Sequence, residues 1–333
     1  MDRRPLGTTG LSVSALGFGA GAVGGLMVRG DPAEQTAAVA RALDAGITYF
    51  DTAPSYGDGR SERNLGRVLR DLDAWRHVVV GTKVRLRPSD LADPTEAIRR
   101  SCEDSLARLD HESVDLLQLH NPIAPDGAPA GTVGGSSQAL PLGTVCGPVA
   151  DAMMRLVARG LVRHIGITAL GHTEAVHAAV RSGRFATAQI YFNAANPSAG
   201  FTGASGGEQD FAGLIGAAAA SGVGVINIRV MAAGALSAQP VRHANAGDPG
   251  PLLAAGAAYG HDLERAAALR ALVADLRYDG PLELALRFAL ATPGVSTVLV
   301  GFSDRSQLED ALRWTGRGPV PAAVADRVAA LAR

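Results

Sequence analysis

The chain has 333 residues, of which 47% are hydrophobic, 19% charged and 5% aromatic. Its 31 basic and 32 acidic side chains give a formal charge of -1, a globular composition that excludes disorder, collagen-like repeats and a long coiled coil. The near-zero charge also argues against a basic surface for nucleic acid and against a polybasic tail for anionic membranes.

Eight short apolar runs rich in β-branched residues alternate with longer segments of helical period. Several of these runs are apolar throughout, as strands buried on both faces should be. The predicted strands are 13–18, 48–52, 78–83, 114–120, 164–168, 187–193, 223–228 and 296–301. The predicted helices are 31–45, 61–72, 94–109, 148–159, 173–182, 207–221, 262–275, 281–291, 305–314 and 321–331. We expect the last helix to pack on its own domain through its apolar residues.

Strands that are each followed by a helix predict an α/β fold, a (β/α)8 barrel in one domain over residues 1–333. The alternative is a doubly wound open sheet, which needs a glycine-rich dinucleotide turn between a strand and a helix. The best candidate, Gly17-Phe18-Gly19-Ala20-Gly21, lacks the G-x-G-x-x-G spacing with a helix directly behind it. The pattern therefore favours the barrel.

Three long loops rich in glycine and proline follow predicted strands, at 121–146, 195–208 and 232–261. In a barrel, loops that follow strands lie at the carboxyl-terminal face, where active sites are built. We expect these long loops to be functional lids, and the alternative is that they are tolerated insertions.

The chain carries weak signals of compartment. Its two cysteines, Cys102 and Cys146, are too few for a disulfide framework or a cysteine-based metal site, so a reducing cytoplasm fits best. The uncharged run from Leu11 to Val28 follows two arginines, as a signal or membrane segment would. Five glycines and two serines dilute this run, so we expect no membrane partner.

Four ionisable residues lie at or just beyond the carboxyl ends of three successive predicted strands. Asp51 ends the second strand and Tyr56 follows in the next loop, Lys83 ends the third strand, and His120 ends the fourth. Lys83 is also the only lysine among the 31 basic residues. Each residue alone has a structural interpretation, but in a barrel all four point at one pocket, where polar groups must be paired. Together they predict a site.

The chemistry of these four residues is that of a proton donor. A tyrosine hydroxyl, with an ordinary pKa of about 10, is a poor acid at neutral pH, and a neighbouring cation stabilises its phenolate. Lys83 can be that cation, Asp51 can keep it charged and in place, and His120 can orient a substrate oxygen. The set suits the reduction of a polarised C=O, and it contains no nucleophilic Ser or Cys and no cluster of metal ligands.

At these residues the chain resembles the aldo-keto reductase family. The segment 5–19 is similar to the family's amino-terminal cap and first strand, and 50–57 running into 61–66 is similar to its second strand and following helix. The match continues through Lys83 and His120 to 300–303, so it covers essentially the whole chain. The resemblance implies a (β/α)8 TIM barrel with an N-terminal β-hairpin cap and no Rossmann unit. It also implies a small-molecule carbonyl substrate and NADPH, less often NADH.

The resemblance assigns roles by position. Tyr56 is the general acid, Lys83 and Asp51 tune it, and His120 positions the carbonyl. The cofactor contacts run from the nicotinamide ribose through the carboxamide, the ring and the pyrophosphate to the adenosine phosphate and the last helix. Gly19, Ala20 and Asp51 would contact the ribose, Thr168 and Gln189 the carboxamide, and Ile228 the ring. Arg229 and Met231 would lie beside the pyrophosphate. Gly301, Ser303 and Arg305 would hold the adenosine phosphate, and Asp310 lies on the last helix of the site.

The chain departs from the family pattern where the cofactor would lie. Thr168-Ala169 stands where Ser-Asn is usual, Ile228 replaces a stacking aromatic, and Asp310-Ala311 replaces Glu-Asn. In the phosphate loop Asp304 stands beside Arg305, and the acid would repel a 2′-phosphate that the arginine would attract. NADPH is therefore the expected cofactor, with NADH as the alternative.

The resemblance implies a reductase of aldehydes or ketones and leaves other functions open. The same site run backwards would oxidise a lactol or aldose, and it could accept a C=N substrate. A function of another class is a cofactor-binding regulatory subunit, since some relatives serve as partners of membrane channels. A lyase with Lys83 as a Schiff base is disfavoured, because a lysine held charged by an aspartate is a poor nucleophile. The pattern does not determine the oligomeric state.

Overall fold

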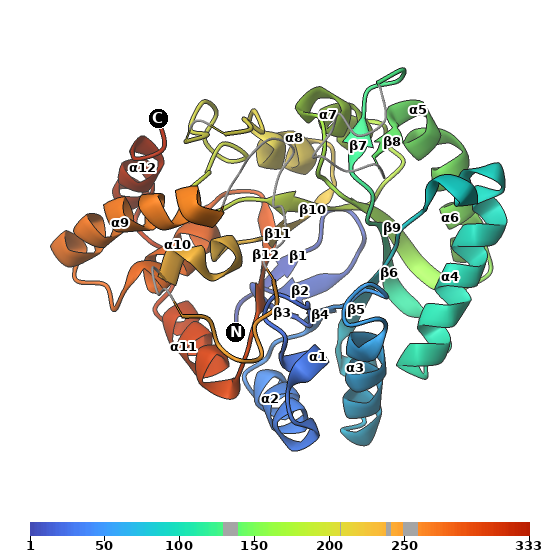
Figure 1. Ribbon diagram of the computed structural model, residues 1–333, viewed down its shortest axis with the longest axis horizontal. Coiled ribbons are helices and arrows are strands. Elements are labelled where there is room, and N and C mark those ends of the chain that lie inside the picture. Colours follow the sequence, from blue (N-terminus) through green and yellow to red (C-terminus); the bar gives the residue numbers. More distant parts are fainter. Residues whose placement is uncertain (129–138, 207, 238–240, 249–258) are drawn as a thin grey trace.

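The centre of the molecule is a closed barrel of eight parallel strands in the order β10-β11-β12-β3-β4-β5-β6-β9 (Figure 1). The computed structural model describes all residues except 129–138, 207, 238–240 and 249–258. The barrel strands are β3 (Leu16–Gly19), β4 (Tyr49–Asp51), β5 (Val79–Val84), β6 (Val114–Leu119), β9 (Val162–Thr168), β10 (Thr187–Tyr191), β11 (Gly224–Ile228) and β12 (Val295–Gly301). Each corresponds to one predicted strand, so the barrel is confirmed.

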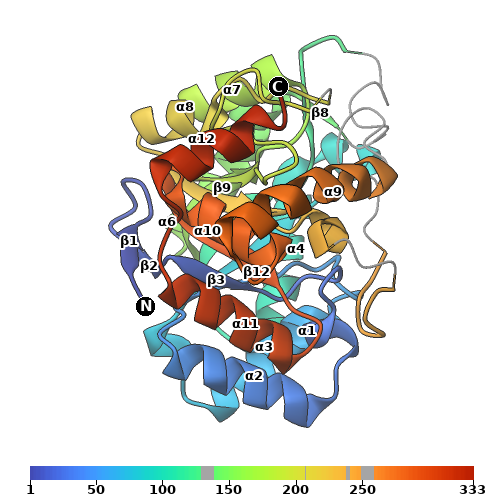
Figure 2. The same ribbon diagram turned by 90° about the vertical axis from the view of Figure 1, so that its left-hand side faces the viewer.

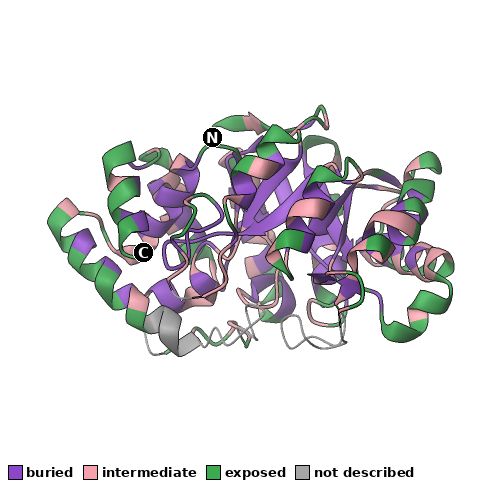
Figure 3. Cartoon of the chain, turned by 90° about the horizontal axis from the view of Figure 1, so that it is seen from above, coloured by how far each residue is buried: buried purple, intermediate pink, exposed green. Residues whose placement is uncertain are grey.

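Helices surround the barrel and turn their exposed faces outward (Figure 3). Aspartates cap three of them: Asp31 accepts hydrogen bonds from the backbone of Ala33 and Glu34, Asp93 accepts one from Glu96, and Asp304 accepts one from Gln307. The helices are α1 (Leu26–Arg29), α2 (Pro32–Asp44), α3 (Arg60–Asp71), α4 (Pro94–Leu109), α5 (Leu142–Thr144), α6 (Ala150–Ala158), α7 (Thr173–Arg181), α8 (Leu214–Ala220), α9 (Tyr259–Leu276), α10 (Pro281–Ala291), α11 (Arg305–Gly316) and α12 (Ala322–Ala330).

A small hairpin closes the amino end of the barrel. β1 (Arg3–Pro5) pairs antiparallel with β2 (Ser12–Ser14), and Leu6, Leu11 and Val13 pack on side chains inside the barrel. The predicted strand 13–18 is therefore wrong as a single element, because its first residues belong to the hairpin and the barrel strand starts at Leu16. The Ser14 side chain accepts a hydrogen bond from Thr48 N–H and donates one to the carbonyl of Leu16, which fixes the bend.

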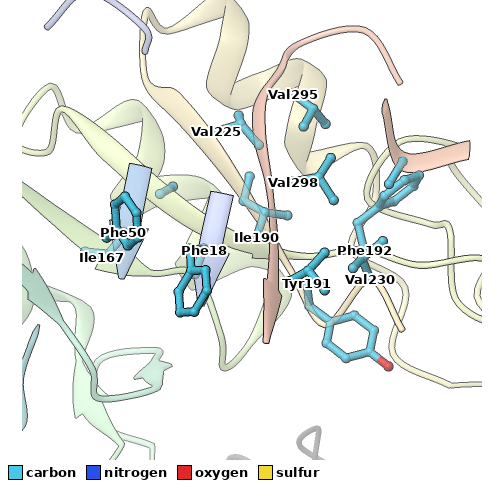
Figure 4. Close-up of a cluster of buried hydrophobic side chains, with 14 of the residues drawn as sticks. Phe18, Phe50, Ile167, Ile190, Tyr191, Phe192, Val225, Val230, Val295 and Val298 are labelled. Atoms are coloured by element: carbon cyan, nitrogen blue, oxygen red, sulfur yellow. The ribbon is translucent and has the colours of Figure 1, made fainter. Parts of the chain in front are cut away.

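The main core lies between the barrel and its helices. Figure 4 shows Ile190 of β10, Val225 of β11 and Val295 and Val298 of β12 in this core, with Phe18 and Phe50 on β3 and β4. The Phe18 and Phe50 rings lie 5.4 Å apart, centroid to centroid. Figure 2 shows α10, α11 and α12 on the side of the barrel where β12 lies. In the tail, Val320 and Val328 are buried in this core and Val324 packs on it, so the expected packing is confirmed for them, whereas Leu331 is exposed.

The long loops differ in part from the prediction. Loop 121–146 contains β7 (Ile123–Ala124) and β8 (Leu140–Pro141), which pair with each other, and α5. The predicted helix 207–221 begins only at Leu214, because Ala212 and Gly213 have positive φ and break the helical path. Loop 232–261 opens with a 3-10 turn over Ala232–Ser237, and α9 begins before its end, at Tyr259. The parts at 129–138, 207, 238–240 and 249–258 lie outside the described residues.

No helix among the described residues has the length and hydropathy to cross a bilayer.

Candidate active site

A cavity of about 670 Å³ opens at the carboxyl ends of the barrel strands. Most residues predicted for the site line it: Gly19, Asp51, Tyr56, His120, Thr168, Gln189, Ile228, Arg229, Met231, Gly301, Ser303 and Asp310. Three do not. Lys83 is buried directly behind Tyr56, Ala20 is buried directly after β3, and Arg305 is exposed at the start of α11.

The centre of the site is a buried ion pair. The Lys83 ammonium and the Asp51 carboxylate are in direct contact, and their side chains are 1% and 2% exposed. Lys83 Nζ also donates to the carbonyl of Thr52 at 2.8 Å and to the Tyr56 hydroxyl at 3.1 Å. Its three hydrogens are thereby all used, which fixes the ammonium beside the tyrosine. The structure thus brings together the residues at the ends of β4 and β5 as the spacing predicts.

Further groups hold the Asp51 carboxylate in place. Its Oδ2 accepts hydrogen bonds from the Tyr49 hydroxyl at 3.1 Å, from Gln118 at 3.3 Å and from Gln189 at 2.6 Å. Gln189 is predicted to bind a carboxamide, and its amide nitrogen is engaged by Asp51 while the side chain lines the cavity. The sequence pattern does not predict this contact, because it joins strands on different sides of the barrel.

The charges of the site follow from these contacts. Burial disfavours the charge on Lys83, but the neighbouring Asp51 and Tyr56 outweigh it and raise the pKa of the ammonium. The lysine therefore stays protonated. At His120, burial and the cations Lys83, Arg85 and Arg229 keep the pKa of the imidazole well below its ordinary value. A neutral imidazole has one N–H donor, and the His120 ring lies edge-on to Tyr56, with centroids 6.0 Å apart.

A second layer of polar contacts supports this centre from α3. Ser61 donates to the carbonyl of Ala20 at 2.7 Å and therefore accepts from Thr52, whose carbonyl binds Lys83. The next residue, Glu62, is fully buried and accepts from Thr82, the neighbour of Lys83 in β5, at 2.6 Å. Sequence reasoning assigned Ser61 and Glu62 no role. Their position at the start of a predicted helix directly after the Tyr56 loop was the signal available.

At the other end of the cavity the loops after β3 and β12 lie in contact. A Cβ on Gly24 would stand 2.6 Å from the backbone nitrogen of Phe302, so only glycine permits this approach. Ser303 donates to the carbonyl of Gly24 at 2.7 Å. Asp304 caps α11 by accepting from the Gln307 backbone at 2.9 Å, so a carboxylate already occupies that helix terminus.

These residues fit a nicotinamide dinucleotide. Thr168 is 2% exposed and lines the cavity, and its hydroxyl oxygen has no hydrogen-bond partner among the described residues. A buried unpartnered hydroxyl is costly unless a ligand satisfies it, and a carboxamide can do so. Among the residues that the structure describes, no group of three or more His, Cys, Asp or Glu side chains is arranged to hold a metal ion.

The structure thus has the eight-stranded barrel and the buried lysine–aspartate pair beside a tyrosine and a histidine that the sequence resemblance implies for an oxidoreductase without a Rossmann unit. The model of the Aldo/keto reductase family matches residues 15–333, and the chain belongs to this family.

Individual relatives show the range of this family. An L-galactose dehydrogenase of Arabidopsis thaliana is 28% identical over 313 residues, which cover 93% of this chain and 86% of that protein. A probable voltage-gated potassium channel subunit beta of Oryza sativa subsp. japonica is 37% identical over 129 residues, 37% of this chain and 38% of that protein. An aldo-keto reductase of Bacillus halodurans, solved in its holo form, matches with a TM-score of 0.73 at 24% identity, covering 100% of this chain and 97% of that chain. The last likeness concerns the fold.

Proposed function

We propose that this protein uses NADPH, or alternatively NADH, to reduce the carbonyl of a small aldehyde or ketone, with Tyr56 as the general acid. The observation that carries the proposal is the Tyr56 hydroxyl, which lines the cavity and lies 3.1 Å from the buried ammonium of Lys83. Proton donation by tyrosine is the chemistry for which this arrangement is suited.

Each residue of the site has a part in the proposed reaction. His120 donates a hydrogen bond to the carbonyl oxygen and so orients and polarises the substrate. When bound, the reduced nicotinamide supplies the hydride that the carbonyl carbon receives. Tyr56 gives its hydroxyl proton to the oxygen, and the Lys83 ammonium stabilises the phenolate that remains. Asp51 keeps the ammonium in place throughout.

The same residues can catalyse the reverse reaction, in which the Tyr56 phenolate accepts the proton of an alcohol. The match with an L-galactose dehydrogenase over 93% of this chain favours an aldose or lactol as the candidate substrate for this direction. The match with a potassium channel subunit beta supports a regulatory role as the second candidate function. A regulatory role predicts that the protein binds a dinucleotide but turns over substrate very slowly.

A fluorescence titration of the purified protein with NADPH and with NADH, followed by a panel of aldehydes, ketones, aldoses and cyclic imines, tests the proposal. We expect binding of a dinucleotide and its oxidation by a carbonyl compound, or reduction of its oxidised form by an aldose. Binding without turnover of any compound would favour the regulatory role. Failure to bind either dinucleotide would contradict both functions.

Asp304 is expected to weaken NADPH binding relative to NADH. Its carboxylate is 23% exposed, lies 3.3 Å from His243 and stands at the start of α11 beside Ser303. Replacing it in Asp304→Asn keeps a helix-capping side chain but removes the negative charge, so the affinity for NADPH relative to NADH should rise by about threefold to tenfold. Titrations with both dinucleotides measure this ratio. An unchanged ratio would mean that the 2′-phosphate does not approach Asp304, and the exposed Asp326→Asn on α12 is the matched control.

A further inference from the structure

Arg85 stands at the catalytic end of the cavity, and sequence reasoning missed it. It follows β5 directly and lines the cavity together with Tyr56 and His120. One of its terminal nitrogens lies 3.5 Å from the carbonyl oxygen of His120. Alternate residues of a strand face the same side, so the position of Arg85 two residues after Lys83 was the available signal.

The place of Arg85 in the barrel separates it from the residues proposed to hold the pyrophosphate. The ring order is β10-β11-β12-β3-β4-β5-β6-β9, in which β5 stands opposite β11 and β6 stands opposite β12. Arg229 and Met231 follow β11, and Ser303 follows β12. A dinucleotide held by these loops would place its phosphates across the barrel from Arg85. Arg85 therefore lies on the side of the cavity where Tyr56 and His120 stand.

Arg85 also lacks an acidic partner. In the part of the chain that the structure describes, no carboxylate forms an ion pair with it, although many other arginines have one. The nearest acidic residue of the catalytic centre, Asp51, is already paired with Lys83. Burial is the main cause of the lowered pKa of His120, and the cations Lys83, Arg85 and Arg229 add to it, so positive charge surrounds the substrate end. An anionic group entering this end would find a cation that is not yet neutralised.

We propose that Arg85 selects carbonyl substrates that carry a carboxylate. This inference rests on the proposed function and names the substrate class of the same site. A guanidinium offers two parallel N–H donors that match the two oxygens of a carboxylate, and its single charge balances a single negative charge. His120 and Tyr56 then receive the carbonyl oxygen while Arg85 holds the far end of the molecule, which makes Arg85 a residue of specificity.

The test compares acidic and neutral aldehydes in the full-length protein. The substrates are ω-oxo carboxylates of increasing chain length and the primary amides of the same length, 4-oxobutanoate and 4-oxobutanamide among them. We expect kcat/KM of the wild type to favour the acid by about tenfold to a hundredfold, as a charge-assisted hydrogen bond would give. In Arg85→Gln this ratio should fall to near unity, chiefly through KM for the acid. Arg87→Gln, an exposed arginine of the same loop that does not line the cavity, should keep the wild-type ratio.

A binding measurement separates this inference from the proposed function. Calorimetry measures the binding of 4-hydroxybutanoate to the wild type and to Arg85→Gln. Each protein is titrated once with saturating oxidised dinucleotide and once without dinucleotide. The measurement does not depend on turnover. Carboxylate binding that depends on Arg85 in a protein that turns over no carbonyl would support Arg85 as the residue that binds the carboxylate and would overturn the proposed carbonyl reduction. Turnover with equal kcat/KM for acid and amide would support the function and overturn the inference. A preference for phosphorylated aldehydes over carboxylates would also overturn it.

Discussion

Replacing Tyr56 with phenylalanine is expected to lower kcat for carbonyl reduction by a factor of about 10²–10⁴, the range that a general acid contributes. The substitution removes only the hydroxyl that lies 3.1 Å from Lys83 Nζ, and the ring can keep its edge contact with His120. Dinucleotide affinity should change by less than about threefold, since the hydroxyl serves the proton and not the cofactor. Steady-state kinetics and a fluorescence titration of the same preparation measure both quantities.

Tyr278→Phe provides the matched control for this experiment. Tyr278 is partly buried, and the guanidinium carbon of Arg287 lies 4.9 Å from the centroid of the Tyr278 ring. Tyr278 does not line the cavity. The same chemical change there should leave kcat within about twofold of the wild type, because Tyr278 contributes no group to the cavity. If Tyr56→Phe kept the wild-type kcat, another group would have to donate the proton. Loss of dinucleotide binding in Tyr56→Phe would instead assign the hydroxyl to the cofactor.

The fold could be predicted because its pattern is periodic. Apolar β-branched runs alternate with helical segments, and the predicted bounds of 94–109 and 281–291 coincide with α4 and α10. The errors occur where a local feature interrupts the period. Residues 13–18 form an unbroken run in sequence, yet the Ser14 side chain bends the chain between hairpin and barrel. Positive φ angles at Ala212 and Gly213 delay the start of α8, and the residue pattern before them does not predict this delay.

The site was predictable only where the barrel itself brings residues together. The ends of neighbouring strands are adjacent in any such barrel, so Lys83 and Asp51 could be paired from the sequence. The contact from Gln189 to Asp51 joins residues 138 positions apart across the barrel, and it depends on side-chain direction within the interior. The support of Thr52 and Ala20 by Ser61 depends on how α3 packs, which periodicity does not define. Such contacts depend on how side chains pack in three dimensions.

Replacing Lys83 with methionine is expected to cost both activity and stability. The change leaves the Asp51 carboxylate, 2% exposed, without its cation, and breaking one side of a buried ion pair typically costs about 3–5 kcal/mol of unfolding free energy. The kcat should also fall, because the cation in contact with the Tyr56 hydroxyl is then absent. Urea unfolding and kinetics measure the two effects. Arg76→Met, which breaks an exposed pair with Asp73, should cost less than about 1 kcal/mol.

The double variant Lys83→Met with Asp51→Asn distinguishes the two roles of the pair. Neutralising both partners removes the unpaired buried charge, so most of the lost stability should return. Activity should not return, because the cation remains absent. Since Asp51 and Tyr56 raise the pKa of Lys83, the ammonium remains charged up to at least its ordinary value of about 10.4, and an alkaline loss of activity below that pH does not arise from this lysine. A double variant that regained both stability and kcat would show that the pair only supports the fold, and Tyr56 would then act without it.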